Sequence, residues 1–391
     1  MSKIIVIGGG ASGLVSAICA KRKGHDVTII EKNNKCGKKI LATGNGHCNY
    51  LNDDFSIKHY RSTNIDKLNI INDKSKDEIL NFFESIGISS KNKNGYLYPI
   101  SNMAVSVQNA LVMECNRLGI NILYNTEIES LKYDEDFVIN NEYHADKVVL
   151  STGSYVGSNG IGYDICKSFG HSVIKPLPAL VSLKSDVKFV KEWAGIRIDS
   201  RLELNENGNI IAKEDGELVL TDYGASGICA MQLSGRINRG LDNNKKEKLI
   251  IDFLPMIDDR DFLNKRNKLL KGRNIVELME GLINYKLLYV LYKSINLNME
   301  NSYDELSSDE KDKLYKVIKE FELNIIGTKD FNDAQVCSGG IPLTEIDLNT
   351  MESLKQKGLY ITGELQDVDG DCGGYNLGYA WLTGIIVGKN I

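Results

Sequence analysis

The sequence contains no closely spaced pair of cysteines. Its eight cysteines are scattered over 391 residues, and none belongs to a C-x-x-C motif. This absence argues against a zinc ribbon and against a dithiol redox motif, and we expect no metal site. Scattered cysteines in a chain of this length are typical of reduced thiols, so we expect most of them to be small buried residues in a cytoplasmic protein.

The sequence also has no excess of basic residues and no long apolar run. Its formal net charge is −5 and its sequence pI is about 5.7, which argues against nucleic acid as a partner. The apolar start at residues 4–7 is too short for a signal peptide or a membrane span. We therefore expect a small-molecule substrate and no membrane, with the oligomeric state open. The chain is long enough for two or three domains.

Residues 3–31 have the pattern of a β-α-β unit. Residues 4–7 are continuously apolar, as in a parallel strand covered on both faces. Apolar residues then recur at helical spacing over residues 12–23, and Gly24 ends this helix. A second apolar run at residues 27–30 predicts the next strand.

A glycine motif, Gly8-Gly9-Gly10-Ala11-Ser12-Gly13, lies between the first strand and the helix. Gly8 permits a tight turn, Gly10 lets the backbone approach a pyrophosphate, and Gly13 allows the helix to pack closely on the strand. The helix N-terminus offers N–H donors to the phosphates. Glu31 follows the second strand, where its carboxylate can accept ribose hydroxyls. The pattern predicts a Rossmann-type dinucleotide site.

The rest of the chain changes pattern twice. Helices are predicted near 76–90 and 102–118, strands at 120–124 and 147–151, and a hairpin near 131–144. From 181 to 255, alternating apolar residues around Asn207-Gly208 predict antiparallel strands. Residues 256–330 are charged and helical, with a capping box at 307–310 before an apolar repeat from Leu314 to Phe321. From 331 onward the first domain is completed. The predicted fold class is α/β with a discontinuous Rossmann-type domain, an inserted antiparallel β domain and a small helical subdomain.

Three later segments favour FAD over NAD. Residues 38–49 form a lysine- and glycine-containing loop that suits a phosphate and a ring, and residues 148–153 are a strand ending in a small-residue turn. Residues 358–376 contain a strand ending in Gly-Glu, then a glycine turn and an apolar helix. That helix can direct its N-terminus at the flavin edge that gains negative charge on reduction. We predict that FAD is bound by Gly8, Gly10, Ala11, Ser12, Gly13, Glu31, Lys32, Lys38, Lys39, Thr43, Gly44, Asn45, Gly46, Thr152, Gly153, Gly363, Glu364, Gly373, Gly374, Tyr375 and Asn376.

With these segments, the chain resembles the bacterial aminoacetone-oxidase-like and bile-acid-reductase-like FAD enzymes. The resemblance rests on the glycine motif with Glu31, the T-G-N-G-x-C-N loop at 43–49 and four later segments, 221–227, 251–255, 335–341 and 358–376. It implies an FAD domain formed by residues 1–180 and 331–391. It also implies that the β domain (181–255) and the helical subdomain (256–330) form the lid of a substrate cleft.

The chain departs from this family at two positions. His47 stands where the family usually has Arg, and Thr221-Asp222 stands where it has a Thr-His pair, so a particular family activity is not carried over. His47 could shuttle protons or have no role. Cys48 could face the flavin or simply pack, and Asp222 and Tyr223 could contact substrate or form a turn. The catalytic side chains stay unknown.

The chain has no second G-x-G-x-x-G motif for a nicotinamide, since residues 157–162 have the order G-x-x-G-x-G. NAD(P)H would therefore visit the flavin transiently, or O₂ would close the cycle. We predict an FAD-dependent oxidoreductase that exchanges hydride between a small organic substrate and flavin N5. A flavin-dependent RNA-modifying enzyme and a non-catalytic flavin redox sensor remain the alternatives.

Overall fold

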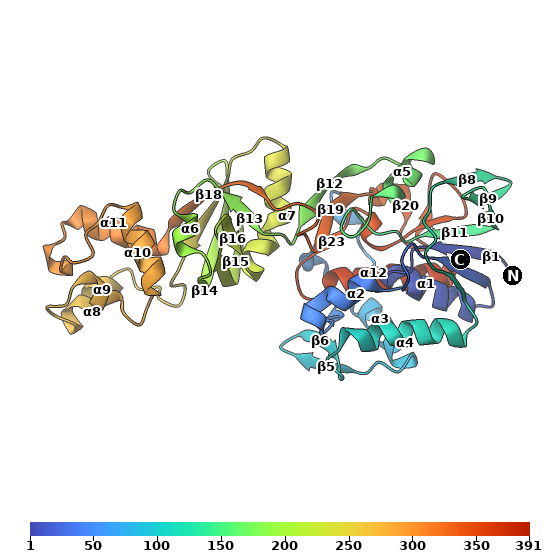
Figure 1. Cartoon of the computed structure of the whole chain (residues 1–391), viewed down its shortest axis with the longest axis horizontal. Coiled ribbons are helices and arrows are strands. Elements are labelled where there is room, and N and C mark those ends of the chain that lie inside the picture. The colour runs from blue at the N-terminus through green and yellow to red at the C-terminus, as the bar shows by residue number, and fades with distance from the viewer. The chain divides into compact units, whose positions relative to one another are not determined.

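The computed structural model describes residues 1–391, and the chain folds into two compact units. Unit 1 contains Met1–Leu177 and Val336–Ile391, and unit 2 contains Pro178–Gln335. In Figure 1 the first and last parts of the chain, blue to teal and red, therefore belong to the same unit.

Unit 1 is built on a seven-stranded sheet with the order β20-β21-β22-β11-β1-β2-β7. Strand β1 pairs in parallel with β2 and with the central strand, β11, and β11 pairs in parallel with β22. Residues 4–7 of β1 are almost completely buried, which explains why that run is continuously apolar. The strands are β1 (Lys3–Ile7), β2 (Asp26–Ile30), β7 (Asn121–Leu123), β11 (Lys147–Leu150), β20 (Ile346–Asp347), β21 (Glu352–Ser353) and β22 (Leu359–Ile361).

Two helices from opposite ends of the chain, α1 (Ala11–Arg22) and α12 (Tyr375–Asn390), lie against each other in unit 1. Glycines on α12 make this close approach possible. A Cβ added at Gly384 would lie 2.7 Å from the Ser12 carbonyl oxygen, and one at Gly388 would lie 2.1 Å from the Cys19 Cβ. The C-terminal segment thus packs directly on the helix that follows the glycine motif.

Smaller elements complete unit 1. The predicted hairpin near 131–144 is a three-stranded sheet, β10-β9-β8. The remaining helices are α2 (Lys38–Ala42), α3 (Asp73–Ser85), α4 (Ala104–Arg117) and α5 (Ile161–Ser168). The remaining strands are β3 (Leu51–Asn52), β4 (Tyr60–Arg61), β5 (Ser90–Lys93), β6 (Tyr96–Pro99), β8 (Leu131–Asp134), β9 (Asp136–Ile139), β10 (Tyr143–Ala145), β19 (Val336–Gly340), β23 (Asp369–Gly370) and β12 (Ile174–Ala179), whose last two residues belong to unit 2.

Unit 2 contains a closed antiparallel barrel with the order β13-β16-β15-β14-β17-β18. Its longest hairpin joins β14 to β15 through Asn207 and Gly208, whose φ angles of 50° and 97° are those of a left-handed turn. The strands are β13 (Leu183–Ser185), β14 (Arg197–Glu206), β15 (Asn209–Leu220), β16 (Gly224–Ser226), β17 (Glu247–Asp252) and β18 (Phe321–Thr328), and α7 (Ile228–Asp242) packs on them.

The helices of unit 2 share one apolar core with the barrel. They are α6 (Val190–Trp193), α8 (Phe262–Leu269), α9 (Ile275–Met279), α10 (Tyr285–Ser294) and α11 (Ser308–Lys319). The predicted capping box is present, with Ser307 and Glu310 capping α11. The apolar repeat, however, extends past the helix: Phe321 begins barrel strand β18, in which alternate residues are buried.

The fold class predicted from the sequence is confirmed, since a parallel Rossmann-type sheet is combined with an antiparallel barrel and several helices. None of the helices is both long enough and apolar enough to cross a membrane.

A buried glutamate on β17 gives the barrel a pH-dependent stability. Glu247 is 4% exposed, and apart from the neighbouring Glu206 carboxyl neither of its carboxyl oxygens has a hydrogen-bond partner. Burial and the neighbouring Glu206 raise the pKa of Glu247 to about 7. Between its ordinary pKa of 4.5 and about 7, the folded protein therefore holds a proton that the unfolded chain has lost. Stability falls as pH rises through this window, and the loss is complete above it.

We expect Glu247→Gln to stabilise the protein above pH 7 by about 2–3 kcal/mol, because a neutral amide avoids the buried charge. The gain should disappear below pH 4.5. Thermal unfolding from pH 4 to pH 8 measures the effect. Glu322→Gln is the matched control, since Glu322 is 61% exposed and pairs with Lys248 across the barrel surface. A pH-independent effect of Glu247→Gln would contradict the prediction.

Candidate functional site

The glycine motif occupies the turn between β1 and α1. Gly8 has a φ of 102°, and a Cβ there would lie 2.4 Å from the Ser151 carbonyl oxygen. A Cβ at Gly13 would lie 2.0 Å from the Gly8 carbonyl oxygen. At Gly10, by contrast, no atom lies within 4 Å of an added Cβ. The first and last glycines thus permit close backbone packing, whereas the middle one faces open space that a phosphate needs.

The N-terminus of α1 begins at this open position. Gly10 is its N-cap, and no side chain caps the helix. Free N–H groups at a helix N-terminus form a favourable anion site. Ala11 and Ser12, which were predicted to contact the cofactor, form the first turn, with Ala11 half-buried and Ser12 buried.

Glu31 links the end of β2 to the glycine motif. One carboxylate oxygen accepts a hydrogen bond from the Gly9 N–H at 2.8 Å. The other oxygen accepts from the backbone N–H and the side-chain amide of Asn33, at 2.8 and 2.6 Å. The carboxylate therefore fixes the glycine turn and retains lone pairs for further donors.

The lysines that follow β2 have different partners. Lys39 forms an ion pair of 2.5 Å with Glu364, which joins two predicted site residues from opposite ends of the chain. The other carboxylate oxygen of Glu364 accepts the Cys337 N–H at 2.9 Å. Lys38 donates to Asn33 at 2.7 Å, and Lys32 approaches the Gly157 carbonyl at 3.3 Å.

The predicted loop at 43–49 contains a short 3-10 turn, Thr43–Gly46, after α2. Gly44, Asn45 and Gly46 all have positive φ angles, and Thr43 donates to the Ile40 carbonyl at 2.6 Å. His47 is exposed and lies 2.9 Å from the Asn102 carbonyl oxygen. Burial raises the pKa of Cys48 to about 11, so this fully buried side chain is a packed thiol at neutral pH.

The ends of two strands, β11 and β22, meet beside α1. The Ser151 hydroxyl after β11 lies 2.7 Å from the Thr362 hydroxyl after β22. Thr362 in turn donates to the Ser12 hydroxyl at 3.1 Å. Thr152, Gly153 and Gly363 therefore lie at the carboxyl ends of parallel strands, the edge at which open α/β sheets bind ligands. No atom lies within 4 Å of a Cβ added at Gly153.

The C-terminal glycine turn precedes α12. Gly373 and Gly374 have φ angles of 133° and 94°, and Gly374 is the N-cap of the helix. Asn376 accepts the Gly370 N–H and donates to the Gly370 carbonyl, both at 2.8 Å. The Asn376 amide thus stabilises the turn. Tyr375 is the first residue of α12.

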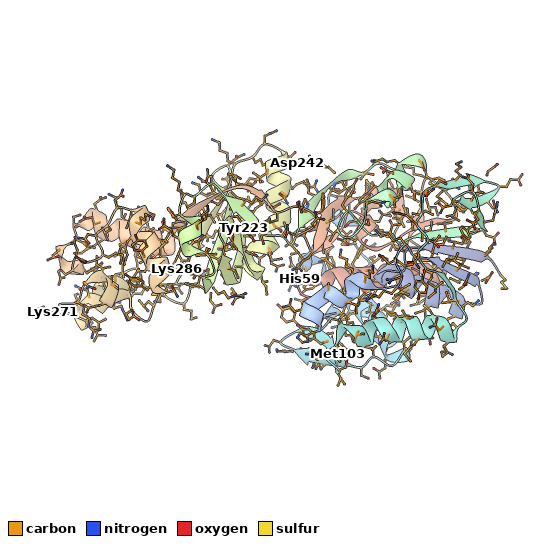
Figure 2. The ribbon with its side chains drawn as sticks, in the orientation of Figure 1. His59, Met103, Tyr223, Asp242, Lys271 and Lys286 are labelled. Atoms are coloured by element: carbon orange, nitrogen blue, oxygen red, sulfur yellow. The ribbon has the colours of Figure 1, made fainter.

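Sequence reasoning missed a charged network beside this turn. His59 and Arg61 both contact Asp371, and of these three residues only Asp371 belongs to a predicted motif. Only the antiparallel pairing of β4 with β23 brings them together, and no local pattern signals it. Figure 2 labels His59 in unit 1 and Tyr223 in unit 2. In unit 2, the Lys329 ammonium lies 4.4 Å from the Tyr223 ring centroid.

These residues fit FAD. An open backbone position at Gly10, an uncapped helix N-terminus and a strand-end carboxylate suit the pyrophosphate and ribose. A second helix N-terminus at Gly374 suits a ring that gains negative charge. All eight cysteines are free, and the structure shows no cluster of metal-binding side chains.

Comparison with known proteins gives the same assignment. The family described as HI0933-like protein Rossmann domain matches residues 2–390. Over its whole length the chain is 37% identical to the 3-dehydro-bile acid delta(4,6)-reductase of Clostridium scindens, covering 98% of that protein. It is 27% identical to the ribosomal RNA dihydrouridine synthase of Escherichia coli, over 97% of this chain and 95% of that protein.

A solved structure shows the same fold. The 3-ketosteroid-delta4-(5alpha)-dehydrogenase from Rhodococcus jostii RHA1 is 15% identical, with a TM-score of 0.50, and the match covers 100% of this chain and 96% of that one. The resemblance to bile-acid-reductase-like flavoproteins and the oxidoreductase class predicted from the sequence are thereby confirmed. The chain belongs to the HI0933-like Rossmann family.

Proposed function

We propose that this protein is an FAD-dependent oxidoreductase that reduces a carbon–carbon double bond next to a carbonyl group in a small organic substrate. The open backbone at Gly10 between β1 and α1 carries the cofactor part of the proposal, because it leaves room for a phosphate at the uncapped helix N-terminus. FAD, when bound, supplies hydride transfer at its ring.

The residues of the chain bind and orient the cofactor. The α1 N-terminus and Gly10 receive the pyrophosphate, and Glu31 accepts the ribose hydroxyls while it holds the Gly9 N–H. The Lys39–Glu364 pair joins the loop after β2 to the segment after β22, and we assign it to the middle of the cofactor. Gly374 and Tyr375 present the α12 N-terminus to the ring.

The substrate class is inferred from what two relatives have in common. One is named for reduction of a 3-dehydro-bile acid and the other for synthesis of dihydrouridine. Both names describe saturation of a double bond conjugated with a carbonyl group. In such a reduction, hydride adds to the carbon distant from the carbonyl and a proton adds to the adjacent carbon. Transient NAD(P)H would reduce the cofactor and so supply the hydride, whereas O₂ can only take electrons from the reduced cofactor and would serve the opposite, substrate-oxidising direction.

A second candidate is reduction of uridine in RNA, which the 27% identical relative favours. The net charge of −5 disfavours it, since RNA binding depends on basic surfaces. A small-molecule substrate is also supported by the higher identity to the bile acid reductase, 37% over the whole chain.

The test begins with the purified protein, which should release FAD rather than FMN on denaturation. NADH or NADPH should bleach its absorbance without oxygen, and a 3-oxo-4-ene steroid should restore it. Restoration by uridine-containing RNA alone would favour the second candidate. A protein that binds only NAD, or that holds FAD but is reoxidised by neither the steroid nor the RNA, would refute the proposed reductase.

A further inference from the structure

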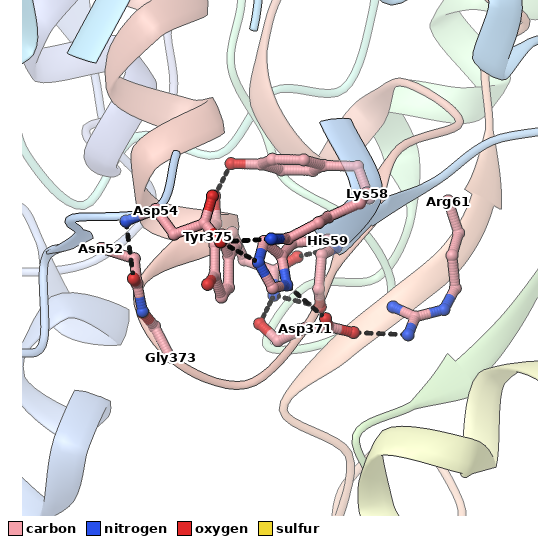
Figure 3. A network of polar contacts seen from close by, with 11 residues as sticks. Asn52, Asp54, Lys58, His59, Arg61, Asp371, Gly373 and Tyr375 are labelled. Atoms are coloured by element: carbon pink, nitrogen blue, oxygen red, sulfur yellow. Dashed lines mark hydrogen bonds and ion pairs between the residues drawn. The ribbon is translucent and has the colours of Figure 1, made fainter. Parts of the chain in front are cut away.

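A charged network surrounds His59, next to the turn that precedes α12 (Figure 3). The Nδ1 atom of His59 lies 2.9 Å from an Asp371 carboxylate oxygen, and its Nε2 atom lies 3.1 Å from an Asp54 carboxylate oxygen. Arg61 binds the other oxygen of Asp371. Lys58 pairs with Asp54 at 2.6 Å. The imidazole is thus held on both sides by acidic side chains.

The contacts of His59 suit a ring that is protonated on both nitrogens. A carboxylate only accepts hydrogen bonds, so each ring nitrogen that faces one must donate. An imidazole that donates from both nitrogens is an imidazolium. Lys58, Ser56 and His59 itself hold the pKa of Asp54 well below its usual range, so the Asp54 carboxylate is ionised at neutral pH.

The same segment holds the turn before α12 by its backbone. Strand β4 pairs with β23, with Arg61 opposite Asp369 and Tyr60 opposite Gly370. The His59 carbonyl accepts the Asp371 N–H at 2.9 Å, and the Tyr60 hydroxyl donates to the carbonyl of Tyr375, also at 2.9 Å. Residues 59–61 therefore form hydrogen bonds both to the start of the turn, at 369–371, and to Tyr375, the first residue of the helix.

The His59 ring also contacts Tyr375 directly. The two rings stack with their centroids 4.3 Å apart and an angle of 22° between their planes. A cation stacked on an aromatic face is attracted to it. A positive charge on His59 would therefore lie beside the N-terminus of α12, where the proposed function locates the cofactor ring.

We propose, resting on the function proposed above, that His59 is a positioning residue for bound FAD. It holds Tyr375 and the α12 N-terminus in place, and its positive charge favours the reduced and more negative form of the cofactor. This role follows from electrostatics, because fixed charges stabilise the state in which opposite charge develops. His59 itself does not take part in the transfer of hydride.

The test compares the reduction potential of bound FAD in matched variants. His59→Phe keeps the stacking on Tyr375 and removes the charge and both hydrogen bonds. We expect it to bind reduced FAD about tenfold more weakly relative to oxidised FAD, which lowers a two-electron potential by about 30 mV. His59→Arg, which restores a cation that can donate to both carboxylates, should return the potential toward the wild-type value.

His144→Phe is the control, because His144 pairs with Asp136 at 2.9 Å in the small β10-β9-β8 sheet, outside the predicted FAD site. It should leave the potential unchanged. If His59→Phe does not fold, His59→Gln decides, since its amide can still donate to Asp371. A wild-type potential in the folded variant overturns the role of His59, even if FAD content falls. Wild-type protein without FAD would instead overturn the proposed function.

Discussion

Gly10→Val should abolish FAD binding and leave the fold intact. The backbone at Gly10 is extended, with φ −84° and ψ −164°, a conformation that valine adopts readily. No atom outside the neighbouring residues lies within 4 Å of an added Cβ, so the backbone leaves room for a side chain there. It would instead fill the space assigned to the pyrophosphate. Thermal unfolding of the apoprotein should match wild type, while flavin absorbance after purification should fall to near zero.

Gly13→Ala is the matched comparison, three residues along the same motif. Its added methyl group would lie 2.0 Å from the Gly8 carbonyl oxygen, so α1 and the turn after β1 must move apart. Overpacking of this kind costs about 1–3 kcal/mol or more, and the apoprotein itself should be destabilised. Equal FAD occupancy in wild type and Gly10→Val would place the cofactor elsewhere. We expect the Gly13→Ala apoprotein to be less stable than the Gly10→Val apoprotein. Equal stability of the two would contradict the packing role of Gly13.

Local features of the fold could be predicted from the sequence because short-range rules determine them. Residues 4–7 of β1 are buried on both faces, and their continuous apolar run indicates this directly. The Asn207-Gly208 turn and the Ser307 capping box follow from the conformations that these residues favour. The prediction that the helical repeat continues to Phe321 was wrong at its end, because the alternating strand β18 begins within one turn of the end of α11.

Contacts between distant segments could not be predicted in the same way. The ion pair of Lys39 with Glu364 joins residues 325 positions apart, and the His59–Asp371 contact joins residues 312 apart. Neither pair leaves a periodic or motif signal. The bond from the Gly9 N–H to Glu31 was also unforeseen, although both residues belong to the motif, because the sequence suggested only a ribose partner for the acid. That the motif residues bind FAD stays a prediction.

A chain that ends at residue 335 should hold no FAD, although it keeps the whole β-α-β unit. The truncation removes β22, the parallel neighbour of β11, and with it α12, which packs on α1. Residues 148–150 and the apolar face of α1, both fully buried in the intact protein, would then be exposed. Burial of apolar surface is the main favourable contribution to folding, so we expect unit 1 to lose its native structure.

Unit 2 provides the internal control for this truncation. Its apolar core runs from Leu183 to Ile325 and lies entirely within residues 178–335. The truncated protein should therefore retain one cooperative unfolding transition, which it shares with an isolated 178–335 fragment, and should lack the transition of unit 1. Circular dichroism melts and flavin absorbance of the intact protein, the 1–335 protein and the 178–335 fragment measure this. A 1–335 protein that purified yellow with full FAD content would refute a binding domain built from both ends of the chain. Such a result would leave the cofactor dependent on the glycine motif and its neighbours alone, without Glu364, Gly374 or the N-terminus of α12.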